Sequence, residues 1–199
     1  MTKELFPRCF SHAPVMGILR GLPADEAVRQ ADTCWDAGIA LVEVSLSERG
    51  ALDALRQVCR RARERQQLAG AGTVVSVAAL HAVSEAGAAF AVAPGVDPGV
   101  IHEARAINMP IMPGVMTASE VQEALSLGCD VLKLFPAALL GPAWVRALLG
   151  PFPALQLVAV GGVTPANAKS FLDAGAIGVA LGSALASSDL KGLIGSLGN

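Results

Sequence analysis

The stretch SLGCDVLKLFP, at residues 126–136, joins the end of a predicted helix to a predicted buried strand. Helices often end with a residue in the left-handed backbone conformation, which favours glycine, and Gly128 stands at such a helix end. The apolar run after it has the length of a strand. Lys133 lies in the middle of that run. Because an unpaired ammonium out of water costs several kcal/mol, a lysine at this position needs a reason.

The same succession of helix end, glycine and apolar run occurs at Gly38, Gly87 and Gly175. This recurrence indicates repeated strand–helix units. Continuous apolar strands joined by helices are typical of a parallel sheet covered by helices. We expect eight strands, at residues 14–20, 39–46, 68–74, 89–94, 110–114, 130–136, 155–162 and 177–183.

Eight such units predict an α/β fold, a single (β/α)8 TIM barrel domain over residues 1–199, with an extra N-terminal helix that closes one end. The alternative is an open doubly wound sheet, but LRGLPADE at residues 19–26 lacks the glycine fingerprint of a dinucleotide site. After the eighth strand we expect a short helix from Ser183, because three glycines follow in the remaining residues.

Composition narrows the function classes. Of the 199 residues, 53% are hydrophobic and 16% charged, the net charge is -2 and there is no tyrosine, so a nucleic-acid partner is not expected. No apolar run has the length of a membrane span and the first residues lack a signal-peptide layout, which predicts a cytoplasmic protein that does not bind membranes. The low charge content suggests that part of the surface meets another subunit.

Cysteine and histidine give no metal-binding pattern. The four cysteines form no CxxC pair and the three histidines are scattered, so we expect reduced, mostly buried thiols and no metal or cofactor.

Two charged residues stand inside apolar strands. Side chains alternate along a strand, so Glu43 shares a face with Leu41 and Ser45, and the apolar residues on either side of Glu43 and Lys133 are free to pack on helices. Both charges should therefore point into the barrel. A structural ion pair is one interpretation, but barrel active sites lie at the carboxyl ends of the strands, and this position favours a functional role.

A lysine in an apolar interior has a lowered pKa, so its neutral amine can attack a carbonyl carbon. The protonated imine that forms withdraws electrons and makes a neighbouring C–H acidic or a neighbouring C–C bond breakable. Glu43 is the natural proton carrier for such a reaction at Lys133.

Two glycine-containing loops follow the last two predicted strands. Gly161 and Gly162 follow the seventh strand, and Gly182 and Ser183 follow the eighth. Phosphate binds to the backbone N–H groups of these two loops in many barrels. Two such loops together therefore predict a phosphate site.

Seven motifs carry a family resemblance. In order and spacing they resemble the 2-keto-3-deoxy-6-phosphogluconate/6-phosphogalactonate aldolases over nearly the whole chain. They are ILRG at residues 18–21, VEVSL at 42–46, GAGTV at 70–74, APG at 93–95, MPGVMTASE at 112–120, LKLFPA at 132–137 and VGGVTPAN at 160–167.

The resemblance implies a metal-independent class I aldolase, usually a homotrimer, that cleaves a phosphorylated 2-keto-3-deoxy sugar acid to pyruvate and D-glyceraldehyde 3-phosphate. Lys133 then matches the Schiff-base lysine and Glu43 the general acid/base. The matching substrate-binding residues are Arg20 and Thr73 for the pyruvate carboxylate, Gly161, Gly162 and Ser183 for the phosphate, and Pro94 and Phe135 in the pocket wall.

The preferred sugar acid depends on small differences. Val160 stands before the glycine pair, as in the phosphogalactonate type, where the phosphogluconate type often has threonine. A missing hydroxyl there removes one possible hydrogen bond to a substrate hydroxyl. APG at residues 93–95 is closer to the phosphogluconate type, and Ser47 departs from both patterns. We expect the phosphogalactonate acid as substrate, with the phosphogluconate acid as the alternative.

Two further functions remain open on the residues alone. A phosphosugar isomerase or epimerase would use Glu43 as a base without covalent chemistry. A non-catalytic barrel that binds phosphorylated metabolites or partner proteins would need the glycine loops but not Lys133 within a strand.

Overall fold

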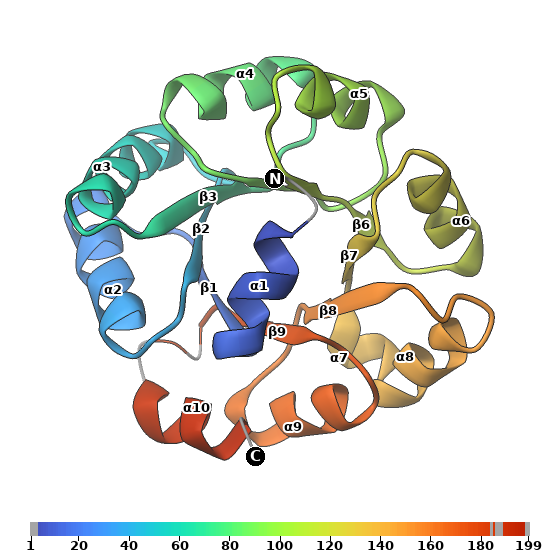
Figure 1. Ribbon diagram of the computed structural model, residues 1–199. Coiled ribbons are helices and arrows are strands. Elements are labelled where there is room, and N and C mark those ends of the chain that lie inside the picture. The colour runs from blue at the N-terminus through green and yellow to red at the C-terminus, as the bar shows by residue number, and fades with distance from the viewer. Residues whose placement is uncertain (1–3, 184, 186–188, 198–199) are drawn as a thin grey trace.

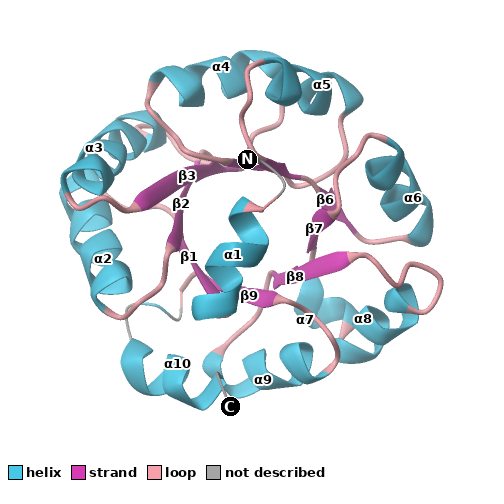
Figure 2. Cartoon of the chain, viewed as in Figure 1, coloured by secondary structure: helices cyan, strands magenta, loops and turns pink. Residues whose placement is uncertain are grey.

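The computed structural model describes residues 4–183, 185 and 189–197. Parallel strands form one sheet in the order β5-β4-β3-β2-β1-β9-β8-β7-β6, which curves into a ring surrounded by helices (Figures 1 and 2). The strands are β1 (Val15–Leu19), β2 (Leu41–Ser45), β3 (Leu68–Gly72), β4 (Ala91–Val92), β5 (Ile111–Met112), β6 (Gly114–Val115), β7 (Val131–Leu134), β8 (Gln156–Val160) and β9 (Gly178–Leu181).

Strands β5 and β6 are two halves of one strand, interrupted at Pro113. On one side Ala93 N–H donates to the Met112 carbonyl at 3.0 Å, and on the other Lys133 N–H donates to the Pro113 carbonyl at 2.9 Å. Proline has no N–H to donate to a neighbouring strand, which accounts for the interruption. β5 and β6, the first and last strands in the sheet order, are therefore joined directly by the polypeptide at Pro113, and this connection closes the ring. The predicted barrel with alternating helices is confirmed, and its eight strand positions match the eight expected runs.

Four helices end where the sequence predicts. Gly38, Gly87, Gly128 and Gly175 all have positive φ at the helix ends. The helices are α1 (Leu5–His12), α2 (Ala24–Asp36), α3 (Ala51–Glu64), α4 (Val77–Glu85), α5 (Pro98–Ala106), α6 (Ala118–Ser126), α7 (Ala137–Leu140), α8 (Pro142–Leu149), α9 (Pro165–Asp173) and α10 (Leu190–Leu197).

The last described helix begins later in the chain than the expected start at Ser183. Ser183 lies in a turn and α10 begins at Leu190, while residues 184 and 186–188 lie outside the described part of the chain. The physical reason is Asp189, whose carboxylate accepts the Gly192 N–H at 3.1 Å. A side-chain acceptor of this kind marks the start of a helix.

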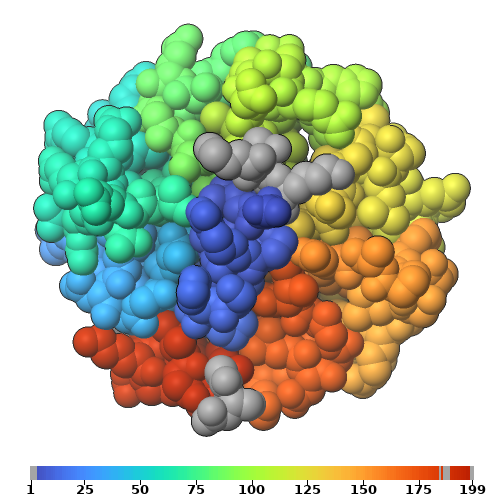
Figure 3. All heavy atoms as spheres, viewed as in Figure 1, coloured from blue at the N-terminus to red at the C-terminus, as the bar shows by residue number. Residues whose placement is uncertain are grey.

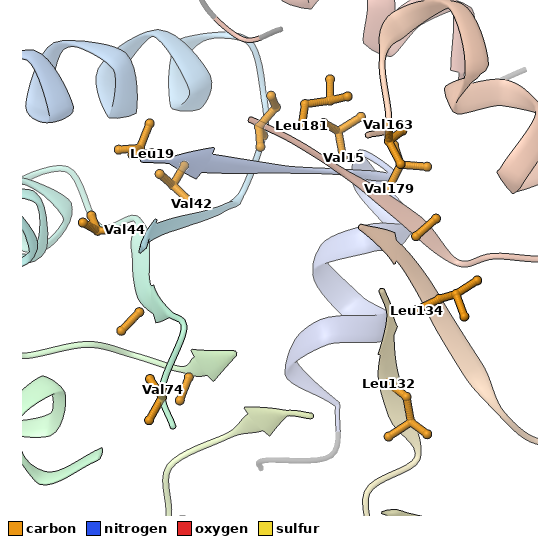
Figure 4. Close-up of a cluster of buried hydrophobic side chains, with 14 of the residues drawn as sticks. Val15, Leu19, Val42, Val44, Val74, Leu132, Leu134, Val163, Val179 and Leu181 are labelled. Atoms are coloured by element: carbon orange, nitrogen blue, oxygen red, sulfur yellow. The ribbon is translucent and has the colours of Figure 1, made fainter. Parts of the chain in front are cut away.

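The core has two layers. Alternate strand residues, such as Val42, Val44, Leu132 and Leu134, point out of the ring and pack beneath the helices (Figure 4). The residues between them fill the interior of the ring. This inner cluster also takes in Phe6 and Phe10 of α1 and Phe90 before β4, and its strand members include Met16, Ile18, Leu41, Val131, Val158 and Val160.

Helix α1 closes one end of the barrel, as the sequence predicts. It lies across the middle of the ring of strands (Figure 1), and its atoms cover the centre of this face of the molecule (Figure 3). Phe6 packs edge-on against Phe90 with ring centroids 5.6 Å apart, and Phe10 lies against Gly178. The strands begin at this end, so their carboxyl ends open at the opposite end. In the described residues, no helix is long and apolar enough to cross a membrane.

Candidate active site

Glu43 and Lys133 both lie inside the barrel. Glu43 is on β2 and is 2% exposed, and Lys133 is on β7 and is 4% exposed. Their neighbours Val42 and Leu132 belong to the outer layer, beneath the helices. The alternation along each strand therefore directs both charged side chains into the ring.

The pKa values of the two groups respond to burial and to each other. Burial raises the pKa of Glu43 to about 7, although Lys133 and then Arg20 oppose the shift. Burial also lowers the pKa of Lys133, against the effect of Glu43 and with a contribution from Arg20. Each shift favours the neutral form of its group. Burial thus makes the amine of Lys133 and the carboxyl of Glu43 easier to hold without charge than they are in water.

The structural ion pair considered from the sequence is not formed. Among the described residues, no salt bridge joins Lys133 to Glu43, and Glu43 Oε2 has no hydrogen-bond partner. A buried carboxyl oxygen without a partner is costly, and such costs are common at functional sites. The geometry favours the functional interpretation.

Gly72 makes room for Glu43. A Cβ atom at residue 72 would lie 2.6 Å from Glu43 Oε1. Any larger residue would displace the carboxyl group, so the third strand needs glycine at this point.

Phe135 connects Lys133 to the open end of the barrel. Lys133 Nζ lies 4.5 Å from the centroid of the Phe135 ring, and Phe135 is 36% exposed. The ring thus touches the buried amine on one side and borders open space on the other.

A cavity of about 560 Å³ opens at the carboxyl ends of β1, β8 and β9. It is large enough for a small phosphorylated acid. Seven of the residues singled out from the sequence line it: Arg20, Phe135, Val160, Gly161, Gly162, Gly182 and Ser183.

Gln30 and Glu48 also line this cavity, and the sequence analysis missed both. Gln30 lies on α2, and Glu48 follows β2 in the loop before α3. The carboxylate of Glu48 lies against Gly21, where a Cβ would be 2.9 Å from Oε1. The cavity is therefore more polar than the glycine loops alone suggest.

Thr73 and Pro94 do not line that cavity. They follow the ends of β3 and β4, and a Cβ on Gly114 would lie 2.3 Å from the Pro94 carbonyl oxygen. Thr73 has φ of +65° and its hydroxyl lies 3.0 Å from Ser45 Oγ. Both residues therefore lie beyond the carboxyl ends of the third and fourth strands, outside the lining of this cavity.

Within the described part of the chain, no group of three or more His, Cys, Asp or Glu side chains could hold a metal ion. Cys9, Cys34, Cys59 and Cys129 are all buried, as expected from the sequence.

Comparison with known proteins gives consistent results. The family model described as "Aldolase: KDPG and KHG aldolase" matches residues 8–193. The 2-dehydro-3-deoxy-6-phosphogalactonate aldolase of Escherichia coli K12 is 35% identical over 173 residues, covering 86% of this chain and 84% of the relative. The KHG/KDPG aldolase of the same organism is 33% identical over 160 residues, covering 80% and 74%.

A solved structure extends the likeness to the whole fold. The KDPG aldolase from Legionella pneumophila, with pyruvate captured at low pH as a covalent carbinolamine intermediate, has a TM-score of 0.81 and 28% identity. The alignment covers 96% of this chain and 95% of that one.

Proposed function

The chain belongs to the KDPG and KHG aldolase family, and we propose that it cleaves 2-dehydro-3-deoxy-6-phosphogalactonate to pyruvate and D-glyceraldehyde 3-phosphate. The observation that carries this proposal is a lysine buried within the barrel, with a lowered pKa and a buried glutamate near enough to shift it. A neutral buried amine is the group that class I aldolases need as nucleophile.

The reaction begins when the Lys133 amine attacks the C2 carbonyl carbon of the substrate. The hydroxyl of the carbinolamine that forms takes up a proton from the solvent and leaves as water, which gives a protonated imine. Glu43, as carboxylate, then accepts the proton of the C4 hydroxyl, directly or through a water molecule. The C3–C4 bond breaks, its electron pair moves toward the imine nitrogen, and D-glyceraldehyde 3-phosphate leaves.

The second half of the reaction reverses these roles. Glu43, now protonated, donates its proton to C3 of the enamine and becomes a carboxylate again. Water then attacks the resulting protonated imine, one proton returns to the solvent, pyruvate is released and the neutral Lys133 amine is restored. A carboxyl with a pKa of about 7 suits both steps, because either form is accessible near neutral pH.

The cavity supplies the phosphate site in this proposal. Gly161 and Gly162 have φ of +93° and +72°, a backbone conformation that favours glycine, and their N–H groups are the proposed phosphate donors. Ser183 can add a hydroxyl donor. Arg20 and Gly182 also line this cavity. We assign Thr73 and Arg20 to the substrate carboxylate and Pro94 and Phe135 to the wall around it.

The phosphogluconate epimer is the second candidate substrate, because a KHG/KDPG aldolase is nearly as similar. Val160 favours the first candidate. It is buried, lines the cavity and has no hydroxyl to bond the C4 substituent of the gluconate epimer. Side-by-side turnover of the two acids separates these possibilities.

The decisive experiment traps the imine. Borohydride reduction in the presence of pyruvate should attach a carboxyethyl group to Lys133, located by peptide mass analysis. Lys133→Met should abolish both labelling and cleavage. Lys169→Met is the matched control, because Lys169 is exposed and paired with Asp173 at 3.1 Å, and it should leave both unchanged. Isomerisation or epimerisation of a phosphosugar, with no trapped adduct, would instead indicate an isomerase or epimerase that uses Glu43 as base.

We also propose that the chain assembles as a homotrimer. Several large apolar side chains are exposed, including Val75, Met116, Leu139 and Trp144. Such residues are enriched where subunits meet. The chain is also 32% identical to part of a designed cage built by fusing symmetric oligomeric domains.

A further inference from the structure

Ser45 is a buried polar residue to which the proposed reaction gives no role. Of the described residues, three polar or charged side chains are buried: Glu43, Lys133 and Ser45. Ser45 is 1% exposed and shares the inward face of β2 with Glu43. A buried hydroxyl is costly unless it is hydrogen-bonded, so the partners of Ser45 are informative.

Those partners are two further hydroxyl groups. Ser45 Oγ lies 3.0 Å from Thr73 Oγ1 and 3.2 Å from Ser47 Oγ. The register of β2 against β3 pairs Ser45 with Gly72, and Thr73 directly follows Gly72 at the end of β3. The three hydroxyls form a chain at the carboxyl ends of β2 and β3. Ser45 is about 6.5 Å further along its strand than Glu43, toward the open end of the barrel.

The backbone of Thr73 is strained. Its φ of +65° is in the left-handed region, which a β-branched residue rarely adopts. Strain of this kind persists where surrounding contacts hold it, and it is concentrated at functional sites. The hydrogen bond between the hydroxyl groups of Thr73 and Ser45 holds the Thr73 side chain against strand β2.

The direction of the hydrogen bonds among the three hydroxyl groups decides which hydroxyl proton is free to bond a ligand. Each hydroxyl has one proton and can accept two hydrogen bonds. If Ser47 donates to Ser45 and Ser45 donates to Thr73, the Thr73 proton remains available for an acceptor. A carboxylate accepts hydrogen bonds and cannot donate them, so it would select this direction.

We propose that Ser45 is a positioning residue of the aldolase site, which orients the Thr73 hydroxyl to donate to the carboxylate of the bound 2-keto acid. This inference rests on the proposed function, because the ligand is the pyruvate unit held at Lys133. Ser45 itself touches Thr73 and Ser47 rather than the substrate.

The test measures imine trapping with borohydride over a range of pyruvate concentrations. In Ser45→Ala, the pyruvate concentration for half-maximal labelling of Lys133 should rise about tenfold, the effect of one hydrogen bond to a charged acceptor. The maximal labelling and its pH dependence should not change, because Lys133 and Glu43 are intact. Ser45→Thr keeps a hydroxyl and should restore the low value. Ser126→Ala is the control, since Ser126 bonds the Glu123 carbonyl on α6, outside the cavity.

A double mutant separates positioning from mere support of the fold. If Ser45 acts through Thr73, the double variant Ser45→Ala/Thr73→Val should match Thr73→Val alone. Additive effects would overturn the proposal, as would an unchanged half-maximal concentration accompanied by a lower melting temperature. Should Ser45→Ala fail to fold, Ser45→Cys keeps the size with a weaker hydrogen bond and replaces it. Absence of labelling in the unmodified protein would contradict the proposed function, whereas normal labelling insensitive to Ser45 would contradict this inference alone.

Discussion

A carboxyl group that titrates near neutral pH can serve as both acid and base, and Glu43 is such a group. Burial raises its pKa to about 7, while Lys133 and Arg20 keep the pKa from rising further. The absence of a direct ion pair matters, because a carboxylate held against the ammonium would keep the lysine protonated. Glu43 and Lys133 are thus close enough to influence each other and remain free to react.

Replacing Glu43 by glutamine should separate the two halves of the chemistry. Glutamine cannot accept the C4 hydroxyl proton, so cleavage should slow by about 10²-fold or more. Lys133 should still be labelled by pyruvate and borohydride, because Glu43 raises its pKa and the removal of Glu43 favours the neutral amine. Steady-state cleavage and peptide mass analysis measure the two effects. Glu123→Gln, at an exposed position on α6, is the matched control. Undiminished cleavage by Glu43→Gln would show that Glu43 has no part in the mechanism.

At the scale of elements, most of the fold could be predicted, because apolar runs and helix-ending glycines are visible in the sequence. The fifth strand was expected as one run, but Pro113 divides it into β5 and β6. The last helix begins at Leu190 because Asp189 accepts the Gly192 N–H, a local cap that the apolar pattern does not indicate.

Less of the site than of the fold could be predicted from the sequence. Lys133 and Glu43 are conspicuous because a charge inside an apolar strand is unusual. Gln30 is not, since a polar residue on a surface helix is ordinary and only the fold brings it to the cavity. The left-handed backbone of Thr73 has no signal in a residue type that normally avoids it.

Helix α1 should contribute strongly to stability through its buried aromatic face. Phe10 is 4% exposed, and a Cβ on Gly178 would lie 2.4 Å from its ring, so the two surfaces fit closely. Phe10→Ala should lower the free energy of unfolding by about 3–5 kcal/mol, because a cavity is left at the end of the barrel. Urea unfolding monitored by circular dichroism measures the change. Glu123→Ala, at an exposed position on α6, should stay within about 0.5 kcal/mol, and a similarly small effect at Phe10 would show that α1 is only loosely docked.

Across the whole molecule, barrel closure creates the site. In the order of the sheet, strands β1, β9 and β8 separate β2 from β7, so Glu43 and Lys133 are not neighbours along any ladder. They influence each other's pKa across the interior of the ring. Burial of both groups therefore links the reaction to folding, because only the closed barrel removes them from water.

That linkage predicts how stability depends on pH. The pKa of Glu43 is about 7 in the folded state, against an ordinary value of 4.5. Between these values the folded state holds a proton that the unfolded state has released, so this contribution, at most about 3 kcal/mol, is complete at low pH and is lost as pH rises toward 7. For Lys133 the folded state binds fewer protons at alkaline pH, so its contribution increases as pH rises toward its ordinary value of 10.5.

Urea unfolding from mildly acidic to mildly alkaline pH should therefore distinguish three proteins. Relative to the unmodified chain, Glu43→Gln should lose the decline in stability between pH 4.5 and 7. Lys133→Met should lose the alkaline increase. It should also move the decline caused by Glu43 to higher pH, because Lys133 is the main group that lowers the pKa of Glu43. Glu123→Gln should parallel the unmodified protein throughout. Identical pH profiles for the unmodified protein and Glu43→Gln would mean that Glu43 is as well solvated in the folded state as in the unfolded one, and the buried acid/base pair would have to be abandoned.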